Sequence, residues 1–184
     1  MKKSIHTLQD TLALQLQGLY FSEKKISAAY GSCSHEISSR NLKYEIRKYI
    51  QGADEKLLKY ERIFNYLMQE PDSKKNKVVV KILEETRDML SFTDSYHLRD
   101  ILMVSCFQNL NAYKISCLKI AYMFTLELEL DTAADLLQQI LESEMETARA
   151  LSRIAIEEFN KAHGTVGVEK QVLLAGHDQD LLDY

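Results

Sequence analysis

The sequence predicts an all-α protein: an up-down-down-up bundle of four long helices with an additional crossover helix. The 184 residues include one proline and six glycines, so few positions interrupt a helix. Apolar residues recur at alternating steps of three and four, which is the spacing of one buried helix face. The clearest linker, residues 70–76, contains the proline and a polar cluster, and it separates two pairs of long helices.

The first two helices have recognisable start signals. Thr7 and Asp10 have the spacing of a capping box, and the helix that they open is expected to reach about Glu36. The next helix is expected to begin at the Ser38–Ser39 pair and to end near Gln69. Its expected buried face consists of Ile46, Ile50, Leu57, Phe64 and Leu67.

The second pair of long helices follows a shorter helix expected over residues 77–90. The third long helix is expected to run from a cap at Thr93 or Asp94 to about Leu126. The fourth is expected to start from a cap at Asp131 or Thr132 and to end at the His163–Gly164 stop signal. Because the long crossover lets the third helix start at the far end of the bundle, the predicted connection is ferritin-like.

The chain is expected to form one domain over residues 1–163, followed by a tail over residues 164–184 that is appended to the bundle or partly disordered. With 23 basic and 27 acidic residues, the net charge of −4 gives no electrostatic reason to expect nucleic acid or a membrane surface as a partner. The three cysteines lack a metal-binding spacing and are expected to be packing residues. We expect a cytoplasmic protein.

Polar residues interrupt the apolar faces near the middle of three long helices. Glu23 lies in the stripe of the first helix and Glu144 in that of the fourth, while Gln108 and Asn111 occupy the middle of the third. A buried carboxylate is unfavourable unless it is paired, hydrogen-bonded or bound to a metal. The sequence therefore predicts a polar cluster inside the bundle.

Several stretches resemble the YciF/YciE-like ferritin-like proteins, a bacterial family often grouped with stress-response genes and without an established reaction. The stretches that carry the resemblance lie at residues 7–12, 19–26, 60–64 and 133–144, and the similarity covers about residues 5–160. The resemblance implies a ferritin-like fold, a homodimer, and a di-metal site built from acids and histidines of four helices.

The ligand positions implied by this resemblance are only partly filled in this chain. Glu23 and Glu144 match the acids of the first and fourth helices. The Glu-x-x-His pair of the second helix falls at Gln51 and Asp54, and an acid of the third helix falls at Asn111. The candidate vestigial cluster therefore consists of Glu23, Gln51, Asp54, Asn111 and Glu144.

Lys114 falls at a second ligand position of the third helix, one turn from Asn111. A lysine ammonium carries three donors and no acceptor, so it repels a metal ion. We predict that Lys114 takes the space of a metal cation and forms a buried ion pair with Glu23 or Glu144.

One function is preferred and two alternatives remain open. The preferred function is a ferritin-like bundle with a degenerate di-metal site and no tightly bound cofactor. This protein would be non-enzymatic and stress-associated, acting through protein contacts as a homodimer whose protein partner the sequence does not name. The first alternative is a protein that binds one divalent cation, Mg, Mn or Ca, through Glu23, Asp54 and Glu144. The second is a di-iron oxidase- or peroxidase-like enzyme, which the missing ligands disfavour.

Overall fold

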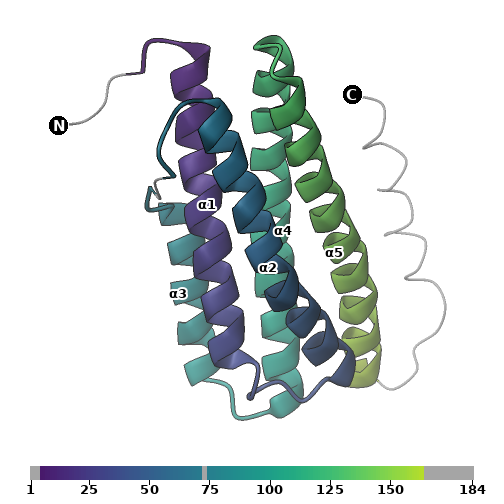
Figure 1. The fold of residues 1–184 in the computed structure, drawn as a ribbon. Helices are drawn as coiled ribbons and strands as arrows, with labels where there is room; N and C mark the ends of the chain where they lie inside the picture. Colours follow the sequence, from purple (N-terminus) through teal and green to yellow (C-terminus); the bar gives the residue numbers. More distant parts are fainter. Residues whose placement is uncertain (1–4, 72–73, 164–184) are drawn as a thin grey trace.

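The computed structural model describes residues 5–71 and 74–163, and within these ranges it contains helices and no strand (Figure 1). The tail expected from residue 164 lies outside the described residues. The helices of the described ranges are α1 (Leu8–Cys33), α2 (Arg40–Tyr66), α3 (Lys77–Ser91), α4 (Tyr96–Glu127) and α5 (Asp131–His163).

The four long helices form the predicted bundle. Figure 1 shows α1 and α2 as one antiparallel pair and α4 and α5 as another, with α2 and α4 running in the same direction. This order is possible because α3 returns the chain along the side of the bundle, where it packs against α4 and α1. The predicted all-α, up-down-down-up architecture with a crossover helix is therefore confirmed.

The starts of α1 and α2 follow the predicted capping chemistry, whereas those of α4 and α5 are shifted. The Thr7 hydroxyl oxygen accepts a hydrogen bond from the Asp10 backbone N–H at 3.0 Å, and the Asp10 carboxylate accepts one from the Thr7 N–H, which completes the capping box. Helix α4 is capped by Ser95 and not by Thr93 or Asp94. All three residue types cap well, so packing of the helix decides among them. Helix α5 begins at Asp131, so the predicted caps Asp131 and Thr132 both lie inside the helix.

Helices α1 and α2 both end earlier than predicted, and α2 is followed by a residue in the left-handed conformation. Helix α1 ends at Cys33, before the predicted Glu36. Helix α2 ends at Tyr66 because Met68 adopts a positive φ of 52°, and the following Gln69 N–H donates to the Phe64 carbonyl at 3.0 Å. This is the Schellman arrangement, in which the left-handed residue turns the chain away from the helix axis.

Helix α4 ends in the same way. Glu129 has a positive φ of 54°, and the Leu130 N–H donates to the Thr125 carbonyl at 2.9 Å. Glycine is the usual residue at such a position, so both Met68 and Glu129 carry some backbone strain.

The core consists of two apolar clusters with a polar layer between them. One cluster lies toward the end of the bundle where α1 ends and α2 begins, and it is built on Ile26, Tyr30, Leu42, Ile46, Tyr49, Met103, Phe107, Leu110, Leu151 and Ile154. The other cluster lies toward the end where α1 begins and α2 ends, and it is built on Leu12, Leu16, Leu19, Tyr60, Ile63, Phe64, Leu118, Leu137 and Ile140. On each long helix, the residues between these two sets form the polar layer, which places the candidate site at mid-height.

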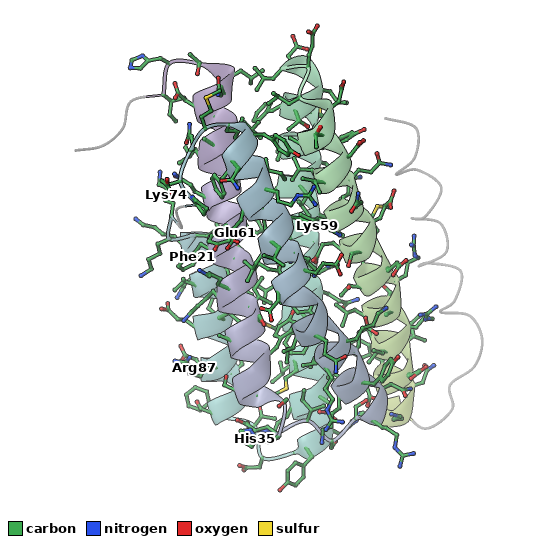
Figure 2. All side chains as sticks on the ribbon, viewed as in Figure 1. Phe21, His35, Lys59, Glu61, Lys74 and Arg87 are labelled. Carbon is green, nitrogen blue, oxygen red and sulfur yellow. The ribbon has the colours of Figure 1, made fainter. Side chains whose placement is uncertain are left out.

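The outer surface is mainly polar. Figure 2 shows Lys74 and Arg87 projecting away from the bundle, and His35 in the connection between α1 and α2 at one end. Glu61 lies where α1 and α2 meet, and it accepts a hydrogen bond from the Tyr20 hydroxyl at 2.6 Å. No helix in the described part of the chain has both the length and the apolar character that crossing a membrane requires.

Candidate functional site

Four charged side chains converge in the polar layer, one from each long helix. They are Glu23 of α1, Lys56 of α2, Lys114 of α4 and Glu144 of α5, with exposed fractions of 0, 5, 1 and 0 %. We call these four residues, together with Tyr49 and Asn111, the central cluster. Burying a charge costs several kcal/mol unless a close partner compensates it, so the hydrogen bonds within the cluster decide whether it can exist.

Lys114 uses all three of its N–H donors. Its Nζ donates to a carboxylate oxygen of Glu23, to the Tyr49 hydroxyl at 2.6 Å and to Glu144 Oε1 at 2.7 Å. The ammonium group thus bridges the two carboxylates and has no further donor to offer.

Lys56 approaches the same carboxylates from α2. Its Nζ donates to Glu144 Oε1 at 2.5 Å and lies 3.4 Å from Glu23 Oε1. The same nitrogen lies 3.9 Å from the centre of the Tyr49 ring, a distance that allows a cation–π interaction. The Tyr49 side chain therefore contacts Lys56 through its ring and Lys114 through its hydroxyl.

Glu144 is the most highly coordinated member of the cluster. Its Oε1 accepts from both lysines, and its Oε2 accepts from the Asn111 side-chain amide at 2.7 Å. The same amide also donates to the Glu144 backbone carbonyl at 3.1 Å, which fixes the position of α5 against α4. The predicted cluster residue Asn111 thus acts as a hydrogen-bond donor to the carboxylate.

The electrostatic balance of the cluster favours the ionised forms of Glu144 and Lys114. Burial alone would raise the pKa of Glu144, but Lys114 and Lys56 lower it to about 2. Burial would lower the pKa of Lys114, but Glu144 and Glu23 raise it above its usual value. Two carboxylates and two ammonium groups give a net charge of zero, so the cluster needs no additional cation for neutrality.

The surrounding phenols stay protonated. Burial raises the pKa of Tyr49 well above its usual value, and the negative charges of Glu23 and Glu144 raise it further. The pKa of Tyr60 is raised by the same causes in the same order. Neither phenol can therefore serve as a base at neutral pH.

The structure brings together four of the sequence-predicted site residues and separates two. Glu23, Asn111, Lys114 and Glu144 meet in the central cluster. Gln51 and Asp54 are exposed on the outer face of α2 and take no part in it. Their placement in the cluster was wrong, because the buried face of α2 carries Tyr49, Ala53, Lys56 and Tyr60, and a helix turns Gln51 and Asp54 away from that face.

Tyr49 and Lys56 are the two cluster residues that the sequence pattern did not predict, and the charged one of them is Lys56. Its signal is positional: it stands three residues after Ala53 and four before Tyr60, on the buried stripe of α2. The predicted stripe had instead included Ile50 and Leu57, which are only half-buried. Lysine and tyrosine are amphipathic and occur on exposed and on buried helix faces. The sequence pattern therefore did not show that the face of α2 with Lys56 is buried in place of the face with Ile50 and Leu57.

The residues of the central cluster do not fit a di-metal centre. Such a centre uses about four carboxylates and two histidines, whereas two carboxylates are present and both are hydrogen-bonded to lysines. In the described ranges, no group of three His, Cys, Asp or Glu side chains is arranged to hold a metal ion. The three-carboxylate site for a single cation also fails to assemble, because Asp54 is exposed.

Two polar atoms of this layer have no hydrogen-bond partner. They are Oε1 of Glu23, which has Lys56 Nζ only at ion-pair distance, and the hydroxyl of Tyr60. An unsatisfied buried polar group costs about 1–3 kcal/mol. The central cluster is therefore well paired around Glu144 and less completely paired around Glu23.

A second buried polar network closes the end of the bundle where α1 ends and α2 begins. Asp100 of α4 accepts from the Ser38 hydroxyl at 2.5 Å and from the backbone N–H groups of Ser38 and Ser39 at 3.0 and 2.7 Å. The Ser39 hydroxyl donates to Glu158 at 2.7 Å, and His97 Nδ1 lies 3.5 Å from the same carboxylate. These contacts hold the start of α2 between α4 and α5, which is a structural role.

Comparison with known proteins identifies relatives with the same fold. A family model described as "Domain of unknown function (DUF892)" matches residues 7–163. Protein YciF of Escherichia coli (strain K12) is 22% identical over 162 residues, which is 86% of this chain and 96% of YciF.

Solved structures show the same likeness. The crystal structure of the E. coli stress protein YciF matches with a TM-score of 0.80 at 20% identity and covers 85% of this chain and 99% of YciF. The structure of YcfI from Rhodopseudomonas palustris matches with a TM-score of 0.79 at 18% identity, covering 83% of this chain and 97% of YcfI. At these identities, the similarity shows a shared fold.

Proposed function

The chain belongs to the DUF892 family, and we propose that within it this protein is a metal-independent, non-catalytic helical bundle. In this proposal the central cluster is a degenerate ferritin-like metal site, in which the ammonium groups of Lys56 and Lys114 have replaced the metal ions. The observation that carries the proposal is the position of Lys114 Nζ, which donates to both carboxylates of the cluster.

The chemistry of the cluster supports a structural role over a catalytic one. The Lys114 ammonium has all three N–H groups engaged, and Glu144 is held ionised by two lysines. A general acid or base must be able to exchange a proton near the working pH, and a nucleophile must have a free lone pair. Lys114 has no free lone pair, and neither Lys114 nor Glu144 exchanges a proton near neutral pH. This supports the proposal that the protein acts through contacts of its surface with other proteins.

A stress-associated role in the cytoplasm is part of the same proposal. One similar protein, YciF of E. coli, is described as a stress protein. Cys33, Cys106 and Cys117 are all free thiols, and free thiols are usual in a reducing compartment. We therefore favour a cytoplasmic bundle that is made under stress and binds partner proteins.

The proposal is tested by elemental analysis of protein produced in medium supplemented with iron and manganese and purified without chelator. We expect far less than one metal atom per chain, because the carboxylates already have cationic partners. The Asp54→Asn variant is the matched control, since Asp54 is an acid that the single-cation alternative needs and that lies outside the cluster. Stoichiometric metal in the native protein that is lost in Asp54→Asn would instead support the single-cation alternative.

A further inference from the structure

A cavity of about 450 Å³ lies between α1, α3 and α4, and no residue of the central cluster lines it. Its floor consists of core side chains that are at most 4 % exposed, namely Tyr30 of α1 and Met103, Cys106 and Phe107 of α4. Its outer wall is α3, which lies along the side of the bundle (Figure 1). The volume falls within the range of about 300–1,000 Å³ that is usual for small-molecule sites.

The cavity exists because α3 covers the side of the bundle incompletely. Only Val79 and Thr86 of α3 are buried. The apolar side chains that α3 contributes to the cavity are half-buried; they are Val80, Leu83 and Leu90. The facing part of α1 contributes small residues, which are Ala28, Ala29 and Ser32. Protein cores normally pack without voids larger than a water molecule, so the small residues of α1 keep open a space that larger side chains would fill.

The interior of the cavity suits an apolar group. Two polar groups on its walls already bond to the backbone: the Thr86 hydroxyl donates to the Ile82 carbonyl at 2.8 Å, and the Cys33 thiol donates to the Tyr30 carbonyl at 3.6 Å. Burial raises the pKa of Cys33 to about 11, so this thiol stays protonated at neutral pH and is a poor nucleophile. A molecule bound here is therefore held without a covalent bond, by burial of its apolar surface.

The mouth of the cavity carries two cations without a partner. Lys25 of α1 and Arg87 of α3 line the cavity and are exposed, and neither forms an ion pair with another residue of the described ranges. Figure 2 shows Arg87 projecting away from the bundle, so its charge lies at the mouth and not in the interior.

The acids at the mouth compensate these cations only in part. They are Glu36, which already pairs with Arg99, and Glu84. Two cations and one carboxylate without a partner leave a net positive charge at the mouth, although the chain as a whole has a net charge of −4. The group that complements this mouth is an anion, and a guanidinium such as that of Arg87 can hold a carboxylate through two parallel hydrogen bonds.

We propose that this cavity binds a small amphipathic anion, with its apolar body against Tyr30, Met103 and Phe107 and its anionic head between Lys25 and Arg87. The class of ligand is a monoanion with a short aliphatic or aromatic body, because the volume is limited and the mouth carries one uncompensated positive charge. This inference goes beyond the proposed function, since the cavity and the central cluster share no residue.

The first test measures the charge preference by equilibrium dialysis of the full-length protein with radiolabelled octanoate. Unlabelled octan-1-ol and octylammonium, which have the same alkyl chain, are the competitors. Octanoate is expected to bind, and octylammonium is expected to compete about tenfold less well than octanoate, because its head meets two cations at the mouth. Absence of octanoate binding at low millimolar concentration would overturn the inference, and so would equal competition by octanoate and octylammonium.

Two double variants test the head group. Lys25→Gln, Arg87→Gln is expected to weaken octanoate binding about threefold to tenfold and to leave competition by octan-1-ol unchanged. The matched control is Lys24→Gln, Arg62→Gln, which removes the same charge from exposed residues that do not line the cavity. The control is expected to bind octanoate like the native protein. An equal loss in both variants would show that only the net charge of the protein matters, and it would overturn the inference.

A cavity-filling variant tests the body of the ligand. Ala29→Leu places a larger side chain in the cavity and is expected to abolish octanoate binding, while the thermal unfolding midpoint stays the same or rises. Ala112→Leu is the matched control, because it makes the same change on the exposed face of α4 and should keep full binding. Unchanged octanoate binding in Ala29→Leu would place the ligand elsewhere and overturn the inference.

Protection of a thiol locates the ligand in the native protein. Saturating octanoate is expected to slow the alkylation of Cys33 by iodoacetamide severalfold, as measured by peptide mass spectrometry. Cys117 is the internal control, because it is also half-buried but does not line the cavity, and it should keep its rate. An unchanged rate at Cys33 would overturn the inference. None of these results bears on the metal content, which tests the proposed function separately.

Discussion

The Nζ atom of Lys114 lies 2.7 Å from Oε1 of Glu144, and both side chains are almost completely inaccessible to solvent. These residues come from α4 and α5, and they lie at the level where the two apolar clusters of the core meet. The stability of the bundle therefore depends on this buried ion pair. Substitution of either residue measures how much the pair contributes to the free energy of unfolding.

Lys114→Met should lower the free energy of unfolding by about 3–5 kcal/mol at pH 7, because it leaves two buried carboxylates with one ammonium group. The matched control is Lys48→Met, since Lys48 pairs with Glu146 at 3.9 Å on the surface and both side chains are more than half exposed. The control should change the stability by at most about 1 kcal/mol. Urea denaturation measures both. Equal effects of the two variants would mean that Lys114 is solvated.

Adding Glu23→Gln to Lys114→Met should recover part of the lost stability. The Glu23 carboxylate accepts from Lys114 and lies only at ion-pair distance from Lys56, so it is left the less compensated of the two acids. A double-mutant cycle in urea should give a coupling free energy of at least about 1 kcal/mol for this pair. Additive effects of the two substitutions would show that the residues do not interact.

Acid should destabilise the native protein more than the Lys114→Met variant. The pKa of Glu144 is lowered from 4.5 to about 2 in the folded state, so the unfolded chain binds the proton first. The contribution of this residue to stability is therefore fully present above pH 4.5 and is lost as the pH falls toward 2. In Lys114→Met the pKa of Glu144 is lowered less, and the loss on acidification should be smaller. Thermal unfolding of the native protein and of Lys114→Met across this pH range shows whether the loss of stability in the variant is smaller, as expected, or the same.

Raising the pH should also weaken the central cluster, because Lys114 then loses its charge. The pKa of Lys114 is raised above 10.5 in the folded state, so its contribution is present below the unfolded value and is lost as the pH rises through the folded one. Stability should therefore fall above about pH 10.5, and this fall should be weaker in Lys114→Met. A fall of the same size in both proteins would assign the alkaline transition to other groups.

Two tyrosine substitutions on α2 should have opposite consequences. Tyr49→Phe removes the hydroxyl that accepts from the Lys114 ammonium, and a hydrogen bond to a charged group is worth about 1.5–3 kcal/mol. Tyr60→Phe removes a buried hydroxyl that has no partner, so it should be neutral or stabilising. Both changes keep the ring and are measured by the same urea titration. A loss of stability in Tyr60→Phe equal to that in Tyr49→Phe would show that the Tyr60 hydroxyl is satisfied.

Most of the fold could be predicted because its determinants are local. Long stripes of apolar residues at steps of three and four define the helices, and the crossover between α2 and α4 determines their directions. The exact helix ends were less predictable. Met68 and Glu129 adopt the left-handed conformation without being glycine, and this depends on the chain that follows each helix.

The candidate site could be predicted in part for a related reason. Glu23 and Glu144 each interrupt a stripe that is otherwise apolar, so the contrast marks them as buried charges. Lys56 gives no such contrast, because its neighbours on the buried face of α2 are Tyr49, Ala53 and Tyr60, which also occur on exposed faces. Only the packing of α2 against α1 and α5 fixes the rotation of the helix and turns Lys56 inward.

We propose that the ammonium groups of Lys56 and Lys114 take the place of metal ions. The most direct test is the thermal unfolding midpoint of the native protein, measured in chelator and then in excess Mn²⁺ or Fe²⁺. A metal bound only by the folded state would add about 2.7 kcal/mol of stability at a concentration 100 times its dissociation constant. The midpoint is expected to be the same in both solutions, because both carboxylates already have lysine partners. A midpoint that rises with metal concentration would contradict this proposal.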